Sequence, residues 1–159
     1  MSSQRKIVTS ERAIEIAEGW RQQGKRISFT NGCFDIIHLG HVDYLEKTRL
    51  LADKMIVGLN TDQSVKSLKG PERPVQDQGS RSRIMAGFEF VDLVVLFDEE
   101  TPAHLIESVR PDVLVKGDDY RFENIVGADF VVKNGGIVET IELVAGYSTS
   151  KIIHKIKSN

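Results

Sequence analysis

Cysteine and long apolar runs are almost absent from this sequence of 159 residues. Cys33 is the only cysteine, so the chain cannot form an internal disulfide, and we expect a reducing compartment, the cytoplasm. No stretch reaches the ~18 consecutive apolar residues that a membrane-spanning helix needs. Residues 1–6 are mostly polar and lack the apolar segment of a signal peptide. These absences predict a cytoplasmic protein with no membrane partner.

An excess of positive charge is also absent. The chain has 21 Lys and Arg residues against 23 Asp and Glu residues, which gives a formal charge of −2, and it has no basic block. Proteins that bind nucleic acids electrostatically concentrate Lys and Arg on one face, so a nucleic-acid partner is not expected. With 40% hydrophobic residues the chain can fill one core, and residues 1–159 are predicted to form a single domain.

Short apolar runs alternate with amphipathic stretches along the chain. Runs typical of strands buried in a parallel sheet occur at residues 26–30, 55–59, 93–97, 113–115 and 137–141. The alternation predicts an α/β fold, a Rossmann-like parallel sheet of about five strands with helices on both faces. A helix at about 10–24 is expected as an N-terminal addition to this sheet. The Gly-x-Gly-x-x-Gly fingerprint of dinucleotide-binding proteins is missing from the first strand's loop.

The first predicted strand ends in the sequence Thr30-Asn31-Gly32-Cys33-Phe34-Asp35-Ile36-Ile37-His38-Leu39-Gly40-His41, and a helical pattern follows at 42–52. Backbone N–H groups at a helix start are unpaired and lie at the positive end of the helix dipole. Glycines in the loop let a charged group approach the main chain. This strand, loop and helix start therefore predict a phosphate-binding site.

His38 and His41 lie three residues apart at this helix start, so both rings can face one bound group. Paired imidazoles beside backbone amides can neutralise charge on a phosphoryl oxygen. The alternatives are two ordinary histidines or a zinc site, and zinc would need further ligands that the sequence does not supply nearby. Cys33 is interpreted as a small buried filler rather than a nucleophile.

Three further stretches carry candidate ligand-binding residues. A long Pro- and Gly-containing loop at 66–80 offers Lys69 and Arg73, although a plain surface loop has the same composition. Polar residues that follow predicted strands lie where open α/β sheets bind ligands; they are Asn60, Lys116, Gly117, Asp118 and Asp119, and a simple turn is the alternative for the last four. Ser148, Thr149 and Ser150 precede a helix and provide either a second anion site or only its N-cap.

The segments Asn31-Gly32-Cys33-Phe34-Asp35 and His38-Leu39-Gly40-His41 resemble the signature of the cytidylyltransferase-like nucleotidyltransferases. Members of this superfamily have a Rossmann-like fold, join a nucleoside triphosphate to a phosphorylated acceptor, and release pyrophosphate. The similarity covers residues 7–156. Further motifs resemble the branch that adenylylates heptose 1-phosphate; they are Leu68-Lys69-Gly70, Arg73-Pro74-Val75, Leu114-Val115-Lys116-Gly117-Asp118-Asp119-Tyr120, Asn134-Gly135-Gly136 and Ser148-Thr149-Ser150-Lys151-Ile152-Ile153.

This resemblance implies transfer of AMP from ATP to D-glycero-β-D-manno-heptose 1-phosphate, which gives ADP-heptose for lipopolysaccharide core and pyrophosphate. It implies catalytic roles for His38, His41 and Lys69, and substrate contacts from Arg73 and Asp119. Asp118 or Asp119 could hold either ribose hydroxyls or the acceptor sugar. The residues expected to bind nucleotide are Thr30, Asn31, Gly32, Cys33, Phe34, Asp35, Gly40, Asn60, Arg81, Lys116, Gly117, Asp118, Ser148, Thr149 and Ser150.

The choice of Arg81 rests on the resemblance alone. If the alignment to the family shifts by two residues across the preceding loop, Arg83 takes its place. Magnesium is expected with ATP, held mainly by phosphate oxygens and water rather than by side chains. Asp35 is the nearest candidate ligand, and it could equally fix its loop by bonding to the backbone. ATP and a sugar 1-phosphate are thus the expected partners, and the resemblance also implies a homo-oligomer.

Two other functions remain open at this point. Cytidylyltransferases of the same superfamily carry Arg-Thr-Glu-Gly-Ile before the last hydroxyl cluster, whereas this chain has Leu143-Val144-Ala145-Gly146-Tyr147. The difference makes CTP less suited, but a cytidylyltransferase for a polyol or amino-alcohol phosphate is the alternative enzyme. A non-catalytic nucleotide-binding regulator is the alternative outside enzymes, and the presence of His38, His41 and Lys69 disfavours it.

Overall fold

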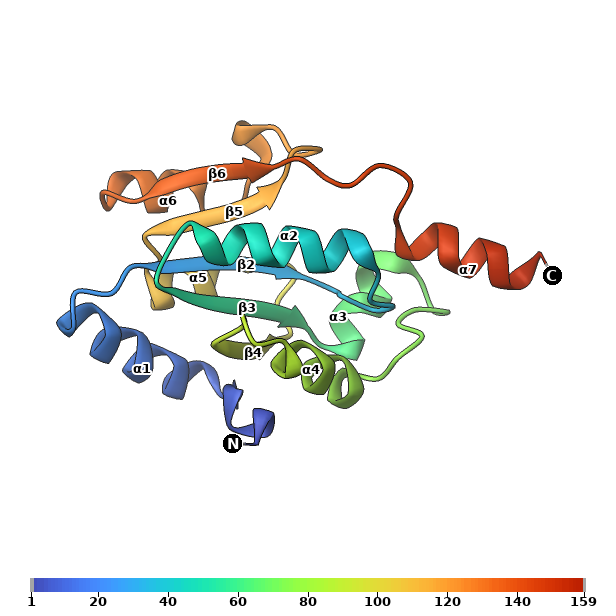
Figure 1. The fold of residues 1–159 in the computed structure, drawn as a ribbon, viewed down its shortest axis with the longest axis horizontal. Helices are drawn as coiled ribbons and strands as arrows, with labels where there is room; N and C mark the ends of the chain where they lie inside the picture. The colour runs from blue at the N-terminus through green and yellow to red at the C-terminus, as the bar shows by residue number, and fades with distance from the viewer. Residues whose placement is uncertain (1, 159) are drawn as a thin grey trace.

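One parallel sheet forms the centre of the computed structural model, which describes residues 2–158 (Figure 1). The spatial order of its six strands is β1-β4-β3-β2-β5-β6. Their bounds are β1 Ile7–Val8, β2 Ile27–Gly32, β3 Lys54–Asn60, β4 Leu93–Phe97, β5 Val113–Gly117 and β6 Ile137–Ile141. The predicted parallel α/β fold is confirmed, but the sheet has one strand more than the expected five. The extra strand is β1, which pairs with β4 at the sheet edge and is too short to give an apolar run.

Seven α-helices connect or flank these strands in the described chain. They are α1 Ser10–Gln22, α2 Leu39–Leu50, α3 Asp62–Lys69, α4 Gln78–Gly87, α5 Ala103–Val109, α6 Ala128–Lys133 and α7 Thr149–Lys157; 3-10 turns occur at Ser3–Lys6 and Phe122–Asn124. The side chains of Thr9, Thr61, Asp77 and Ser148 each accept a hydrogen bond from a backbone N–H in the following first turn. Within residues 2–158, no helix combines the length and apolar character needed to cross a membrane.

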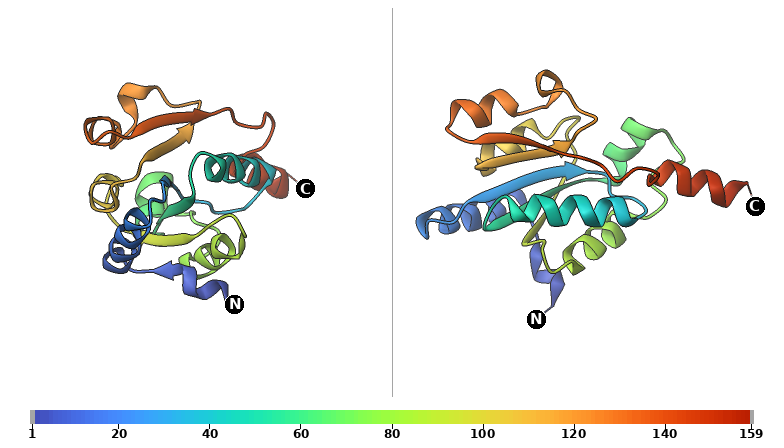
Figure 2. Two further views of the ribbon diagram at one scale, coloured as in Figure 1. Left: turned by 60° about the vertical axis from the view of Figure 1, so that its left-hand side comes forward. Right: turned by 45° about the horizontal axis from the view of Figure 1, so that its top comes forward.

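Helices cover both faces of the sheet, as Figure 2 shows from two sides. Alternate strand residues point to opposite faces, so each strand contributes to two cores. On one face, strand residues such as Phe29 and Ile56 pack with apolar side chains of α1, α5 and α6. On the other face, Met55 and Val57 pack with side chains of α2 and α4. Burial on both faces explains why the strands are nearly continuous apolar runs.

Strand β2 lies at the point where the chain changes direction across the sheet. The chain proceeds from β2 to β3 and β4 on one side, then returns to β5 and β6 on the other. Such a switch point leaves a crevice at the carboxyl ends of the strands, where α/β proteins bind ligands. Helix α7 lies beyond these strand ends (Figure 1), and Thr149 Oγ1 donates to the carbonyl of Ile36 at 3.3 Å.

Candidate active site

A cleft of about 550 Å³ opens at this switch point. Its walls come from the end of β2 and the β2–α2 loop, the start of α2, the end of β3, the end of α3 and the loop after it, the β4–α5 loop, the end of β5 and the turn after it, and the β6–α7 segment with the start of α7. The lining residues are Asn31, Gly32, Cys33, Phe34, Asp35, His38, Gly40, His41, Tyr44, Asn60, Leu68, Lys69, Arg73, Glu100, Pro102, Lys116, Gly117, Asp119, Tyr120, Leu143, Val144, Tyr147, Ser148, Thr149 and Ser150.

The two histidines form a stacked pair at the start of α2. Their ring centroids are 3.8 Å apart and their planes differ by 22°. His38 is the residue that precedes the helix, and its carbonyl accepts a hydrogen bond from His41 N at 2.9 Å. The edge of the Phe34 ring packs near His41, at a centroid distance of 5.3 Å. Neither buried Nδ1 atom has a hydrogen-bond partner among residues 2–158, which is uncommon for buried polar atoms and marks the pair as more than a packing element.

Both imidazoles are neutral at pH 7 in this ligand-free arrangement. Burial lowers the pKa of His41 from 6.5 to about 4, with a smaller contribution from neighbouring His38. Burial also lowers the pKa of His38. Neutral rings can stack closely without repulsion. An anion in the cleft would raise both pKa values, because a nearby negative charge stabilises a protonated imidazole.

The lowered pKa of His41 makes a prediction for stability. Between pH 6.5 and about 4 the unfolded chain binds a proton at this residue that the folded protein does not. The free energy of unfolding should therefore fall as pH decreases through this window, with His41 contributing on the order of 2–3 kcal/mol. Urea unfolding of the wild type and of His41→Gln from pH 4 to 7.5 would measure this. Parallel pH profiles for the two proteins would contradict it.

Glycines allow the close packing around the histidines. A Cβ atom added to Gly40 would lie 3.1 Å from the His38 ring, and one added to Gly32 would lie 3.0 Å from the Phe34 ring. Phe34 itself has a φ of 45°, in the left-handed region that few non-glycine residues adopt. The His38 and Phe34 rings can therefore lie this close to the backbone because Gly40 and Gly32 have no side chains.

Asp35 anchors the loop that follows α3. Its side chain is buried, and its two oxygens accept hydrogen bonds from Arg73 Nε, Val75 N and Gln76 N, each at 2.8 Å. Burial alone would raise the pKa of Asp35, but these hydrogen bonds outweigh burial and hold the pKa below its usual value. Asp35 thus fixes residues 73–76, a loop distant in sequence, rather than its own loop.

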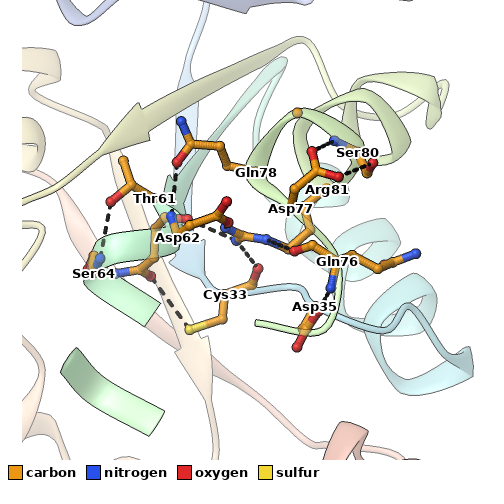
Figure 3. A network of polar contacts seen from close by, with 12 residues as sticks. Cys33, Asp35, Thr61, Asp62, Ser64, Gln76, Asp77, Gln78, Ser80 and Arg81 are labelled. Carbon is orange, nitrogen blue, oxygen red and sulfur yellow. Dashed lines mark hydrogen bonds and ion pairs between the residues drawn. The ribbon is translucent and has the colours of Figure 1, made fainter. Parts of the chain in front are cut away.

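Arg81 does not line the cleft, which corrects its expected place among the nucleotide-binding residues. It is fully buried, and its guanidinium donates to the carbonyls of Cys33, Asn60 and Gln76 at 2.7, 2.8 and 3.0 Å. It also pairs with Asp62 at 2.8 Å. Figure 3 shows Arg81 among Cys33, Asp62 and Gln76 in this network. The N–H donors of the Arg81 guanidinium are occupied by protein groups, so Arg81 positions the cleft walls. Arg83 is exposed on the same helix.

Two more expected contacts lie outside the lining. Thr30 is buried in β2 and its hydroxyl is hydrogen-bonded to Tyr44 Oη at 2.7 Å, so it is occupied within the core. Asp118 is exposed, and its Oδ1 accepts from Leu143 N at 3.3 Å, so it fixes the β6–α7 segment. The other candidates from the sequence all line the cleft, and their contacts with substrate remain predictions.

Lys116 is a buried cation on the wall formed by β5. Only 8% of the residue is exposed, and its ammonium donates to Asn31 Oδ1 at 2.5 Å and lies 5.5 Å from the centre of the Tyr120 ring. Burial lowers its pKa to about 8, although Asp119 partly opposes this shift. A lysine that is desolvated in this way favours an anionic ligand, because a nearby negative charge stabilises its protonated form.

The start of α7 lines the cleft next to the histidines. Ser148 caps this helix by accepting from Lys151 N at 3.2 Å, which leaves the other first-turn N–H groups available. The Tyr147 ring lies parallel to His38 with centroids 6.5 Å apart. Two helix starts, α2 and α7, therefore face the same cleft.

Sequence reasoning missed several lining residues. They are Tyr44, Leu68, Glu100, Pro102, Tyr120, Leu143, Val144 and Tyr147. Glu100 and Pro102 follow the carboxyl end of β4, and this position could have identified them. The irregular segment between β6 and α7 contains Leu143, Val144 and Tyr147. Its path over the cleft depends on where α7 packs, so local sequence could not identify these residues.

A parallel α/β sheet with two helix starts, paired imidazoles and cationic side chains at its switch point defines a nucleotidyltransferase. A family model described as cytidylyltransferase-like matches residues 29–155. The chain belongs to the cytidylyltransferase-like family, which confirms the resemblance noted in the sequence.

Curated relatives match nearly the whole chain. It is 51% identical over 152 residues to "Bifunctional protein HldE" of Azorhizobium caulinodans, and 52% identical over 153 residues to the protein of the same name in Caulobacter vibrioides. Each match covers 96% of this chain and 32% of the relative. The chain therefore spans about a third of the length of these relatives.

Solved structures also resemble the fold. The lipopolysaccharide core biosynthesis protein from Thermoplasma volcanium superposes with a TM-score of 0.62 and 28% identity, over 76% of this chain and 98% of that one. Pantoate-beta-alanine ligase from Francisella tularensis, complexed with an ATP ligand and beta-alanine, superposes with a TM-score of 0.61 over 96% of this chain and 78% of that one. The second match is only 13% identical and shows the fold alone.

Proposed function

We propose that this chain transfers AMP from ATP to D-glycero-β-D-manno-heptose 1-phosphate, giving ADP-heptose and pyrophosphate for lipopolysaccharide core. One observation carries the proposal: the stacked His38–His41 pair, with two unpartnered buried Nδ1 atoms, lies in one cleft with the start of α7. The near-complete match to relatives named HldE supports it, as does the neighbour named for lipopolysaccharide core biosynthesis.

In the proposed reaction a phosphate oxygen of the sugar phosphate attacks the α-phosphorus of ATP. The bond from that phosphorus to the α–β bridging oxygen breaks, and pyrophosphate leaves with the electron pair. The acceptor is already an anion, so no covalent protein nucleophile is required. The protein's task is to position two anions and stabilise charge on the phosphoryl oxygens.

The residues of the cleft suit this task. The rings of His38 and His41 offer N–H donors to the triphosphate, while the N–H groups of α2 and α7 supply positive dipole ends. Lys69, at the exposed end of α3, and Arg73, held by Asp35, add cations on the side opposite Lys116. These groups surround the phosphates from several directions, as an in-line displacement requires.

Magnesium is part of the proposal as a companion of ATP. Residues 2–158 contain no group of three or more His, Cys, Asp or Glu side chains placed to hold a metal ion. Asp35 already accepts three hydrogen bonds and fits poorly as a ligand. The side chains present thus fit a magnesium ion held by phosphate oxygens and water, which would neutralise charge on the triphosphate.

A pyrophosphate-release assay tests the proposal. ATP, heptose 1-phosphate and magnesium should give pyrophosphate at least about a hundredfold faster than CTP with glycerol 3-phosphate, since pairing the right base and acceptor is worth several kcal/mol in the transition state. Chelation of magnesium should abolish the signal. The reverse substrate ranking would favour a cytidylyltransferase, and binding of ATP without pyrophosphate from any sugar phosphate would favour a regulator.

A further inference from the structure

Carboxylates lie at both ends of a cleft whose centre is lined by cationic groups. Asp35, Glu100 and Asp119 line it, together with His38, His41, Lys69, Arg73 and Lys116. Both oxygens of Asp35 are occupied by the 73–76 loop, which leaves Glu100 and Asp119 as carboxylates that a ligand can meet. A carboxylate repels phosphate but accepts hydrogen bonds from hydroxyl groups. These two positions therefore suit the neutral, hydroxyl-bearing parts of the substrates.

The strand order separates the two carboxylates. Glu100 follows β4 and Asp119 follows β5, and β3 and β2 lie between these strands. Three strand spacings amount to about 14 Å at the sheet edge. One sugar ring cannot span that distance, so the two carboxylates serve different groups on either side of the phosphates.

The nucleoside belongs on the side of Asp119. Near the end of β5 the cleft is lined by the side chains of Tyr120, close to Lys116, and of Leu143, close to Gly117, and Val144 follows Leu143 in the chain. Purine rings bind to such surfaces by stacking and apolar contact. On the side of β3 and β4 the lining residues Asn60, Lys69 and Glu100 are polar or charged and suit a sugar phosphate, and Leu68 and Pro102 lie near them in the chain.

Glu100 differs from its acidic neighbours in having no partner among residues 2–158. Asp98 accepts a hydrogen bond from Thr61 Oγ1, and Glu99 accepts one from Asp98 N at 3.0 Å and lies 3.9 Å from His104. Neither Asp98 nor Glu99 lines the cleft, whereas Glu100 does. The start of α5 favours negative charge, and any of these three residues can supply it. The helix dipole therefore does not explain why Glu100 faces the cleft.

We propose that Glu100 binds hydroxyl groups of the acceptor sugar and selects polyhydroxylated sugar phosphates as acceptors. The inference rests on the proposed function, because it assigns the acceptor end of that same cleft. Glu100 takes no part in bond making; it fixes the sugar so that its phosphate can reach the α-phosphorus of ATP.

Steady-state kinetics of Glu100→Gln tests the assignment, with ATP and heptose 1-phosphate as substrates. The variant keeps the shape and one oxygen acceptor but loses the charge, so the KM for heptose 1-phosphate should rise about tenfold, while the KM for ATP should change less than about twofold. Glu99→Gln is the matched control, since it removes the same charge one residue away and should leave both KM values unchanged.

The outcomes are separable. If the wild type is active and Glu100→Gln behaves as Glu99→Gln does, or raises the KM for ATP as much as that for the sugar phosphate, the role of Glu100 is overturned. If the wild type releases no pyrophosphate from heptose 1-phosphate, the proposed function fails, and the inference that depends on it fails as well.

Discussion

Replacement of His41 by alanine is expected to lower kcat by about 10²–10³-fold while the protein remains folded. His41 lies at the start of α2, packs on His38 and lines the cleft, where we expect the phosphates to bind. Loss of one preorganised donor to a phosphoryl oxygen removes stabilisation that exists mainly in the transition state. Single-turnover measurement of pyrophosphate release would give the effect directly.

His154→Ala serves as the matched control for this prediction. His154 is exposed on α7, outside the cleft, and its replacement should change kcat less than twofold. Circular dichroism of both variants would show whether the fold is kept. Similar losses of activity in the two variants would mean that the histidine pair is not the centre of the reaction.

The second large effect is expected for Arg81→Met, which should reduce the free energy of unfolding by about 3 kcal/mol. The substitution leaves the carbonyls of Cys33, Asn60 and Gln76 without their donor in a buried place. For a domain of this size such a loss lowers Tm by about 6–12 °C. Thermal and urea unfolding would measure both quantities.

Arg83→Met is the control, because Arg83 lies on the same helix and is exposed. Its replacement should change the free energy of unfolding by less than about 0.5 kcal/mol. Arg81→Lys should not restore stability, since an ammonium group cannot reproduce the planar fork that reaches three separate segments. Equal stability of the Arg81 and Arg83 variants would contradict the role assigned to this network.

Local pattern was sufficient for strands β2 to β6 and for the β2–α2 loop. Residues 27–50 contain the pattern of a strand, a glycine-containing loop and a helix start, and the structure has β2, the loop and α2 at these positions. The helix expected at about 10–24 is α1 Ser10–Gln22, and the side chain of Thr9 caps it. β1 was not expected, since two residues carry no periodicity.

The roles of Arg81 and Asp35 could not be predicted because they depend on distant parts of the chain. Arg81 bonds to Cys33, 48 residues away, and Asp35 to Gln76, 41 residues away. The sequence shows an arginine at the start of a helix and an acidic residue in a loop, which are equally typical of ligand contacts. Only the packing of α4 beneath the β2–α2 loop turns their side chains inward.

The central claim is that a nucleoside triphosphate lies between the starts of α2 and α7. A crystal structure with magnesium and a non-hydrolysable ATP analogue would test it most directly. Phosphate oxygens are expected within about 3 Å of ring nitrogens of His38 and His41 and of backbone N–H groups at the start of α7. A nucleotide bound outside this cleft, or phosphates that contact neither histidine, would contradict the claim.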